Sequence, residues 1–236
     1  RATRCGSICR RPILPAIRAK ITPQTRLIAI SHVSWLDGAV LPVRQLTGHG
    51  VPVLVDGAQG AGAIPVAVEE LGADYYTASG QKWLLGPART GALYVAADRL
   101  DECRVTFPSY FSWKLPEYEL RDGAVRFEAS WTPAASVAGL LASLAFAAEA
   151  GEARFASAHK AAERCRELLV EHGADVVTEP DQATLVSWRT DEPEAVVNRL
   201  AEQGIVVRDL PGTGLVRASC GYWTSEDDLD RLIRGL

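Results

Sequence analysis

The chain has 236 residues, more than a common domain of roughly 150 residues, so it can bury a substantial core. Hydrophobic residues make up 47% and charged residues 23%, which excludes a disordered or collagen-like protein. Lys and Arg total 25 against 29 for Asp and Glu, and this net charge of -4 provides no basic field for nucleic acid or an anionic membrane.

Cysteine usage and hydropathy favour a reducing cytoplasm. The five cysteines, at positions 5, 9, 103, 165 and 220, form neither a disulfide framework nor a zinc-ligand spacing. The N-terminal segment lacks the apolar run of a signal peptide, and because it does not begin with Met we expect a fragment of a longer protein. The longest uncharged apolar stretch, residues 134–148, is too short to span a bilayer, so we expect a buried helix there.

The first half of the chain predicts an α/β fold. Short β-branched and aliphatic runs predict buried strands at residues 26–31, 52–56 and 74–79. A short helical turn ending at Gly72 is expected between the second and third runs. Strands that alternate with helical segments predict a mainly parallel sheet. A further strand, which we expect to be antiparallel, follows at residues 91–97.

The second half predicts a linking region and a smaller unit. Residues 107–131 are expected to be irregular with one strand pair, followed by helices at 134–150 and 157–172 that bridge into the second unit. The order predicted for this unit is β, α, β, β, α. Its elements are a strand at 185–188, a helix opened by Pro193 and closed by Gly204, strands at 204–208 and 215–220, and a helix capped at Thr224 or Ser225.

Two polar residues follow neighbouring predicted strands. Asp56 ends the run VPVLVD, where ligands of open α/β sheets bind, although a lone Asp there is more often a turn or helix cap. Lys82 follows the next strand, in SGQKWLLGP, and its apolar neighbours are expected to desolvate its amine and favour a Schiff-base nucleophile over an ordinary surface lysine. A carboxylate and a reactive lysine are the two protein groups that pyridoxal phosphate needs.

VDGAQ followed by SGQKWLLGP resembles the cofactor core of the class V aminotransferase family, which includes cysteine desulfurases, selenocysteine lyases and cystine C–S lyases. Further stretches resemble the family across most of the chain: LIAISHVSWLDGAVLPV, RFEASWTPAASVAGLLASL and GIVVRDLPGTGLVRASCGYWTSEDDLDRL. The likeness is greatest to the cysteine/cystine C–S lyase branch, which also has a Trp at the position of Trp35.

The resemblance implies the architecture of fold-type-I transferases that depend on pyridoxal 5'-phosphate. Residues 1–133 would form the C-terminal part of the large cofactor-binding domain, with a mainly parallel sheet. Residues 134–236 would form the interdomain helix and a small C-terminal α/β domain. The family's N-terminal part, which supplies a glycine-rich phosphate-binding turn and a ring stacked on the cofactor, has no counterpart ahead of Arg1.

The resemblance also implies roles for single residues. Lys82 would bind the cofactor aldehyde covalently and act as the catalytic base. The other implied cofactor contacts are Asp56 to the pyridine nitrogen, Gln59 to the phenolic oxygen, Ser79 and Gln81 to the phosphate, His32 in the preceding loop, and Thr132 or Ser130 to the phosphate of a partner subunit. A core role is the alternative for His32.

The implied substrate contacts are Arg217 and Trp35. Arg217 would hold the substrate carboxylate through a bidentate fork, with an arginine at a strand edge as the alternative. Strand alternation predicts that Arg217 and Ser219 share one face while Ala218 and Cys220 share the other.

The resemblance implies an enzyme that acts on an amino acid, by β-elimination at a sulfur-bearing side chain. Transamination, selenocysteine lyase or desulfurase activity, and a truncated silent remnant are the alternatives. A desulfurase needs a nucleophilic Cys between the last two strands, where DLPGTGL has none. We expect a cytoplasmic homodimer with a small amino-acid substrate and no metal, nucleic acid or membrane partner.

Overall fold

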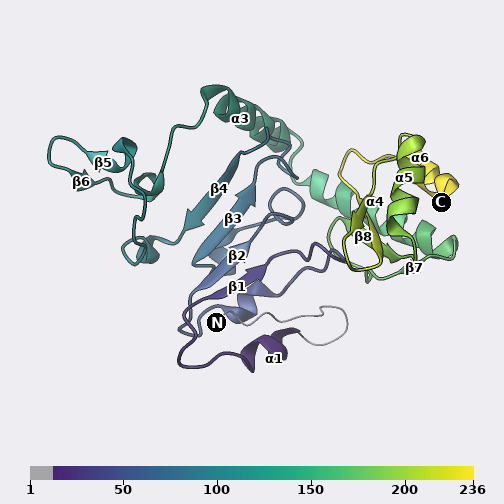
Figure 1. Ribbon diagram of the computed structural model, residues 1–236, viewed down its shortest axis with the longest axis horizontal. Coiled ribbons are helices and arrows are strands. Elements are labelled where there is room, and N and C mark those ends of the chain that lie inside the picture. Colours follow the sequence, from purple (N-terminus) through teal and green to yellow (C-terminus); the bar gives the residue numbers. More distant parts are fainter. Residues whose placement is uncertain (1–12) are drawn as a thin grey trace.

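The first sheet contains the strands that end at Asp56 and just before Lys82. The computed structural model describes residues 13–236, which leaves Cys5 and Cys9 outside the described part (Figure 1). The sheet has the order β1-β2-β3-β4, and its first three strands are parallel while β4 is antiparallel to β3, as predicted. The strands are β1 (Ile28–Ser31), β2 (Val53–Asp56), β3 (Tyr75–Ser79) and β4 (Gly91–Val95).

One face of this sheet is covered by short elements from the N-terminal half. The side chains of Val53 and Val55 alternate into a core that also contains Val43 and Leu46. Three elements pack there: α1 (Ile13–Arg18), the 3-10 helix η1 (Val43–Leu46) and α2 (Val68–Leu71). The helix α2 ends at Gly72, whose φ of 66° terminates the helix in the left-handed region, as the sequence predicted.

The segment between the two halves projects away from the sheet (Figure 1). It contains one two-stranded pair, which confirms the expectation of irregular structure with a single strand pair. Its elements are η2 (Ala97–Arg99), η3 (Tyr110–Ser112), β5 (Trp113–Lys114), β6 (Glu119–Leu120) and η4 (Ala124–Phe127). Several of its aromatic rings are largely exposed, among them Phe107, Tyr110, Tyr118 and Trp131.

Two helices, α3 (Ala134–Glu149) and α4 (Ala153–Glu171), link the first sheet to the second unit. The expectation that α3 is buried is wrong within the described residues, because only Ala147 is buried while Leu141 is 61% and Phe146 58% exposed. The helix α3 carries apolar side chains on all its faces, and the other described residues cover it only in part. No single described helix is long and apolar enough to cross a membrane; α3 and α4 reach that threshold only together, bent by 84°.

The second unit is an antiparallel sheet of order β7-β8-β10-β9 with helices packed on it. The prediction missed one short strand, β7 (Asp175–Val176). The remaining elements follow the predicted order: β8 (Leu185–Arg189), α5 (Pro193–Glu202), β9 (Arg208–Leu210), β10 (Leu215–Ser219) and α6 (Glu226–Gly235). Ser225 caps α6 in a capping box with Asp228, so Ser225 is the N-cap.

The strand predicted at residues 204–208 is displaced toward the C-terminus. It begins at Arg208 because β9 pairs with β10 across a turn in which Gly212 and Gly214 adopt φ of 73° and 70°. Ile205 and Val207 instead pack against the helical core before the strand starts. Their apolar character therefore indicated burial and not strand pairing.

Candidate active site

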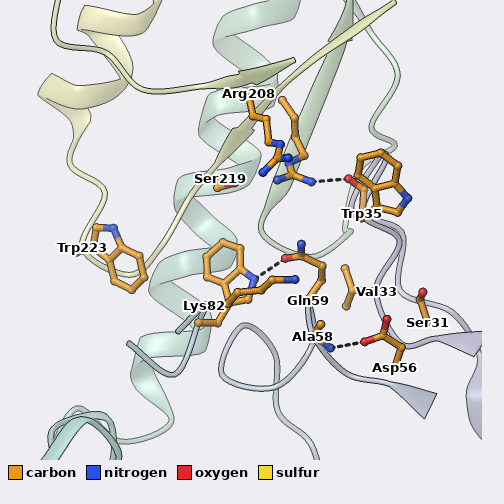
Figure 2. Close-up of a pocket in the computed structure, with 12 residues that line it drawn as sticks. Ser31, Val33, Trp35, Asp56, Ala58, Gln59, Lys82, Arg208, Ser219 and Trp223 are labelled. Carbon is orange, nitrogen blue, oxygen red and sulfur yellow. Dashed lines mark hydrogen bonds between the residues drawn. The ribbon is translucent and has the colours of Figure 1, made fainter. Parts of the chain in front are cut away.

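A cavity of about 550 Å³ lies between the carboxyl edge of the first sheet and the second unit (Figure 2). It brings together five residues that the sequence singled out: Trp35, Asp56, Gln59, Lys82 and Arg217. The other lining residues are Ser31, Val33, Ala58, Trp83, Arg208, Ser219 and Trp223. The cavity is thus built by segments that are far apart in the sequence.

Asp56 reaches the cavity because it is the last residue of β2 in a parallel sheet. Its Oδ1 accepts a hydrogen bond of 2.9 Å from the Ala58 N–H, so Asp56 also caps the turn that follows the strand. No described donor bonds to Oδ2. The carboxylate therefore has one oxygen committed to the turn and one available to a ligand.

The turn after Asp56 is packed against a pair of buried rings. A β-carbon at Gly57 would overlap the Tyr76 ring, and one at Gly60 would lie 3.1 Å from His32 Nδ1. Tyr76 Oη and His32 Nδ1 are 3.0 Å apart. Burial and the charge of Asp56 raise the pKa of Tyr76 to about 12.

His32 is a core residue and does not line the cavity. It is buried against Tyr76, and burial lowers the pKa of its imidazole, which favours the neutral ring. The surroundings of His32 therefore agree with the alternative of a core residue, and its hydrogen-bond partner is the Tyr76 hydroxyl.

Lys82 lines the cavity from within the turn that follows β3, three residues after Ser79, but its side chain is exposed. The expected desolvation by its sequence neighbours is wrong within the described residues. Trp83 turns instead into a small core with Ala63 and Leu185, because successive side chains of a turn diverge. Neighbours in sequence are therefore not the groups that surround Lys82.

Arg217 enters the cavity from β10, which lies between β8 and β9, so the strand-edge alternative is wrong. Its side chain is buried, Nη1 donates a 2.7 Å hydrogen bond to the Trp35 carbonyl oxygen, and Nε is buried without a partner. Burial and the charge of Arg208 lower the pKa of Arg217. The unpartnered Nε indicates a site for an acceptor that the described chain does not supply.

The predicted strand alternation is confirmed. Arg217 and Ser219 line the cavity, whereas Ala218 and Cys220 belong to the core on the other side of the sheet. Cys220 is buried there and is no candidate for a nucleophile in the cavity.

Four other residues that the sequence singled out do not line the cavity. Ser79 pairs with Gly91 at the end of β3, Gln81 is exposed in the next turn, and Thr132 is exposed just before α3, as is Ser130.

Sequence reasoning missed Arg208, which is exposed and lies opposite Arg217 in the pairing of β9 with β10. The turn PGTG carries the signal, because a hairpin centred on it places these two arginines side by side. Trp223, in the loop before α6, was also missed.

The comparisons with known proteins agree with this geometry. Isopenicillin N epimerase from Streptomyces clavuligerus is 30% identical over 267 residues, which cover 96% of this chain and 65% of that protein. A probable cysteine desulfurase from Pseudomonas putida is 33% identical over 239 residues, which cover 92% of this chain and 59% of that protein. The chain therefore spans about three fifths of the length of the curated relatives it matches.

Solved structures share the fold. The cystine C–S lyase C-DES, in complex with its reaction product cysteine persulfide, matches with a TM-score of 0.89 and 32% identity. The match covers 94% of this chain and 63% of that chain, and a mutant of C-DES carries glycine covalently linked to its PLP cofactor. These matches confirm the expected fold class. The family model for class-V aminotransferases matches residues 10–232, and the chain belongs to this family.

Proposed function

We propose that the protein depends on pyridoxal 5'-phosphate and cleaves a carbon–sulfur bond of an amino acid by β-elimination. The observation that carries this proposal is the convergence of Asp56, Gln59, Lys82 and Arg217 on one cavity. The likeness to C-DES supports the same reaction class.

The polar groups of the cavity fit this cofactor. When bound, it supplies an aldehyde for amines and a ring that withdraws electrons from the substrate α-carbon. Lys82 Nζ would hold the aldehyde and then take the proton from the substrate α-carbon. Asp56 Oδ2 would accept the ring N–H and favour its protonated form. Ser79, Gln81 and Thr132, the candidates for the phosphate, lie outside the described lining and remain proposals.

Arg217 would bind the substrate carboxylate. The Trp35 carbonyl already holds Nη1, and the unpartnered Nε faces no described acceptor, so a carboxylate would complete a planar fork. Arg208 adds a second guanidinium beside it. Two cationic groups favour a substrate with more than one negative charge, such as an amino-acid disulfide with two carboxylates.

The position of the cysteines supports a lyase over a desulfurase. The connection between β9 and β10, residues 211–214, contains no Cys, and Cys220 lies in the core behind the sheet. A nucleophilic thiol is therefore not available at the cavity among the described residues.

We also propose a homodimer located in the cytoplasm. The exposed apolar side chains of α3, with Leu141 and Phe146 foremost, would be covered by a second copy, and the exposed Thr132 next to this helix could then serve the partner's site. Three free thiols among the described residues agree with a reducing compartment. We keep residues 1–133 and 134–236 as the proposed domains.

Product analysis of the full-length protein tests the proposal. The protein loaded with pyridoxal phosphate would be supplied separately with cystine, with cysteine, and with an amino acid plus a 2-oxo acid, with Lys82→Ala as the control. We expect pyruvate and a persulfide from cystine. Transfer of the amino group to the 2-oxo acid, with no pyruvate, would replace elimination by transamination.

A further inference from the structure

Trp83 forms the wall behind Gln59. Its indole Nε1–H donates a hydrogen bond of 2.9 Å to Gln59 Oε1, which Figure 2 draws as a dashed line at Gln59. Trp83 is 8% exposed and packs with Ala63 and Leu185. Its ring centroid also lies 6.3 Å from that of Trp223, which comes from the second unit. Trp83 is therefore fixed by contacts from both parts of the chain.

The chemistry of indole determines which way the Gln59 amide faces. An indole N–H is a donor only, so the atom it meets must be the amide oxygen. The Gln59 NH2 group is consequently the end that remains for a ligand in the cavity. Asp56, two residues before Ala58, presents an acceptor instead. The two ends of the turn thus offer opposite hydrogen-bonding polarity.

We propose that Trp83 is a positioning residue that holds the Gln59 amide with its NH2 group toward the phenolic oxygen of the cofactor. This inference rests on the proposed function, because the oxygen belongs to pyridoxal phosphate. Without the indole N–H, both orientations of the amide become accessible. The flipped orientation places Oε1 against the phenolic oxygen, where two acceptors repel each other.

The pH dependence of the visible absorbance of lysine-bound cofactor tests this role. A hydrogen-bond donor to the phenolic oxygen draws electron density from it. This lowers the pKa of the nitrogen that joins Lys82 to the cofactor, because the oxygen then stabilises the protonated nitrogen less. Trp83→Phe keeps a buried ring but removes the donor to Gln59. We therefore expect the midpoint of the pH titration of the visible absorbance to rise by about one pH unit. Gln59→Leu should raise it similarly, and the double variant should add nothing further.

Trp223→Phe is the matched control. It replaces a tryptophan that lines the same cavity and touches Trp83, but it leaves the bond to Gln59 in place. The midpoint of this variant should therefore equal that of the unmodified protein. A midpoint that Trp83→Phe leaves in place, or that Trp223→Phe raises equally, overturns the proposal.

A second readout needs no cofactor. In 15N-labelled protein without cofactor, the hydrogen-bonded indole proton of Trp83 should resonate downfield. In Gln59→Leu this resonance should move upfield, because the bond to Gln59 is lost. A resonance that stays in place shows that the bond is not made and overturns the proposal. Protein that binds no pyridoxal phosphate refutes the proposed function and the role of Trp83 with it. Bound cofactor with an unmoved midpoint refutes the role of Trp83 alone.

Discussion

The Arg217 guanidinium is positioned by the fold before a substrate arrives. The Trp35 carbonyl oxygen binds Nη1 at 2.7 Å, and β10, an inner strand of the second sheet, carries the residue into the cavity. The geometry of this fork depends on the planar guanidinium, which an ammonium group does not reproduce.

Arg217→Lys is therefore expected to weaken substrate binding by about 2 to 5 kcal/mol, because a carboxylate loses a bidentate partner. The KM for the amino acid should rise strongly in steady-state assays, while the visible absorbance of bound cofactor persists. Arg208→Lys is the control, because it also replaces a guanidinium by an ammonium group, at the neighbouring position in the sheet. Normal amino-acid binding by Arg217→Lys, or loss of the cofactor as well, would make Arg217 a structural residue.

Asp56→Asn separates the two roles of Asp56. An asparagine Oδ1 still accepts the Ala58 N–H and preserves the turn, but a neutral side chain no longer favours a protonated ring nitrogen. We expect an unchanged unfolding temperature and an elimination rate that is lower by orders of magnitude. A near-normal elimination rate in the folded variant would show that Asp56 only caps the turn.

At the scale of elements, the turn after β2 depends on its contact with Tyr76. Gly57→Ala introduces a β-carbon that overlaps the Tyr76 ring, so we expect a loss of about 1 to 3 kcal/mol in the free energy of unfolding and weaker cofactor binding. Denaturant unfolding and titration with pyridoxal phosphate measure both effects.

Ser225→Ala is the matched control for this variant. It removes the N-cap of α6, which costs about 1 kcal/mol at a residue that does not line the cavity. Its cofactor affinity should be unchanged. If Gly57→Ala binds the cofactor as well as Ser225→Ala does, the contact between the turn and Tyr76 does not shape the site.

The sequence predicts best the elements whose pattern is local. The runs at β2 and β3 are rich in β-branched or aromatic residues and end at polar residues, so both the strands and the edge where Asp56 lies could be predicted. The start of β9 could not, because its register depends on pairing across the turn to β10. The exposure of α3 could not either, since an apolar run indicates that a helix is covered but not by what.

At the scale of the whole molecule, the cavity exists because two sheets meet. The first sheet contributes Asp56, the turn after its strand β3 contributes Lys82, and the second sheet contributes Arg208 and Arg217. Single site residues could be predicted from motifs, whereas their surroundings depend on the tertiary structure. The exposure of Lys82, the buried partner of His32 and the proximity of Arg208 all arise from chain segments distant in sequence.

The attachment point of the cofactor tests the central claim most directly. Borohydride reduction of the protein loaded with pyridoxal phosphate, followed by peptide mapping, is predicted to place the phosphopyridoxyl mass on Lys82, with none incorporated by Lys82→Ala. Lys82 is the lysine that lines the cavity, whereas Lys20, Lys114 and Lys160 do not. A label on one of those three residues in place of Lys82 would contradict the account.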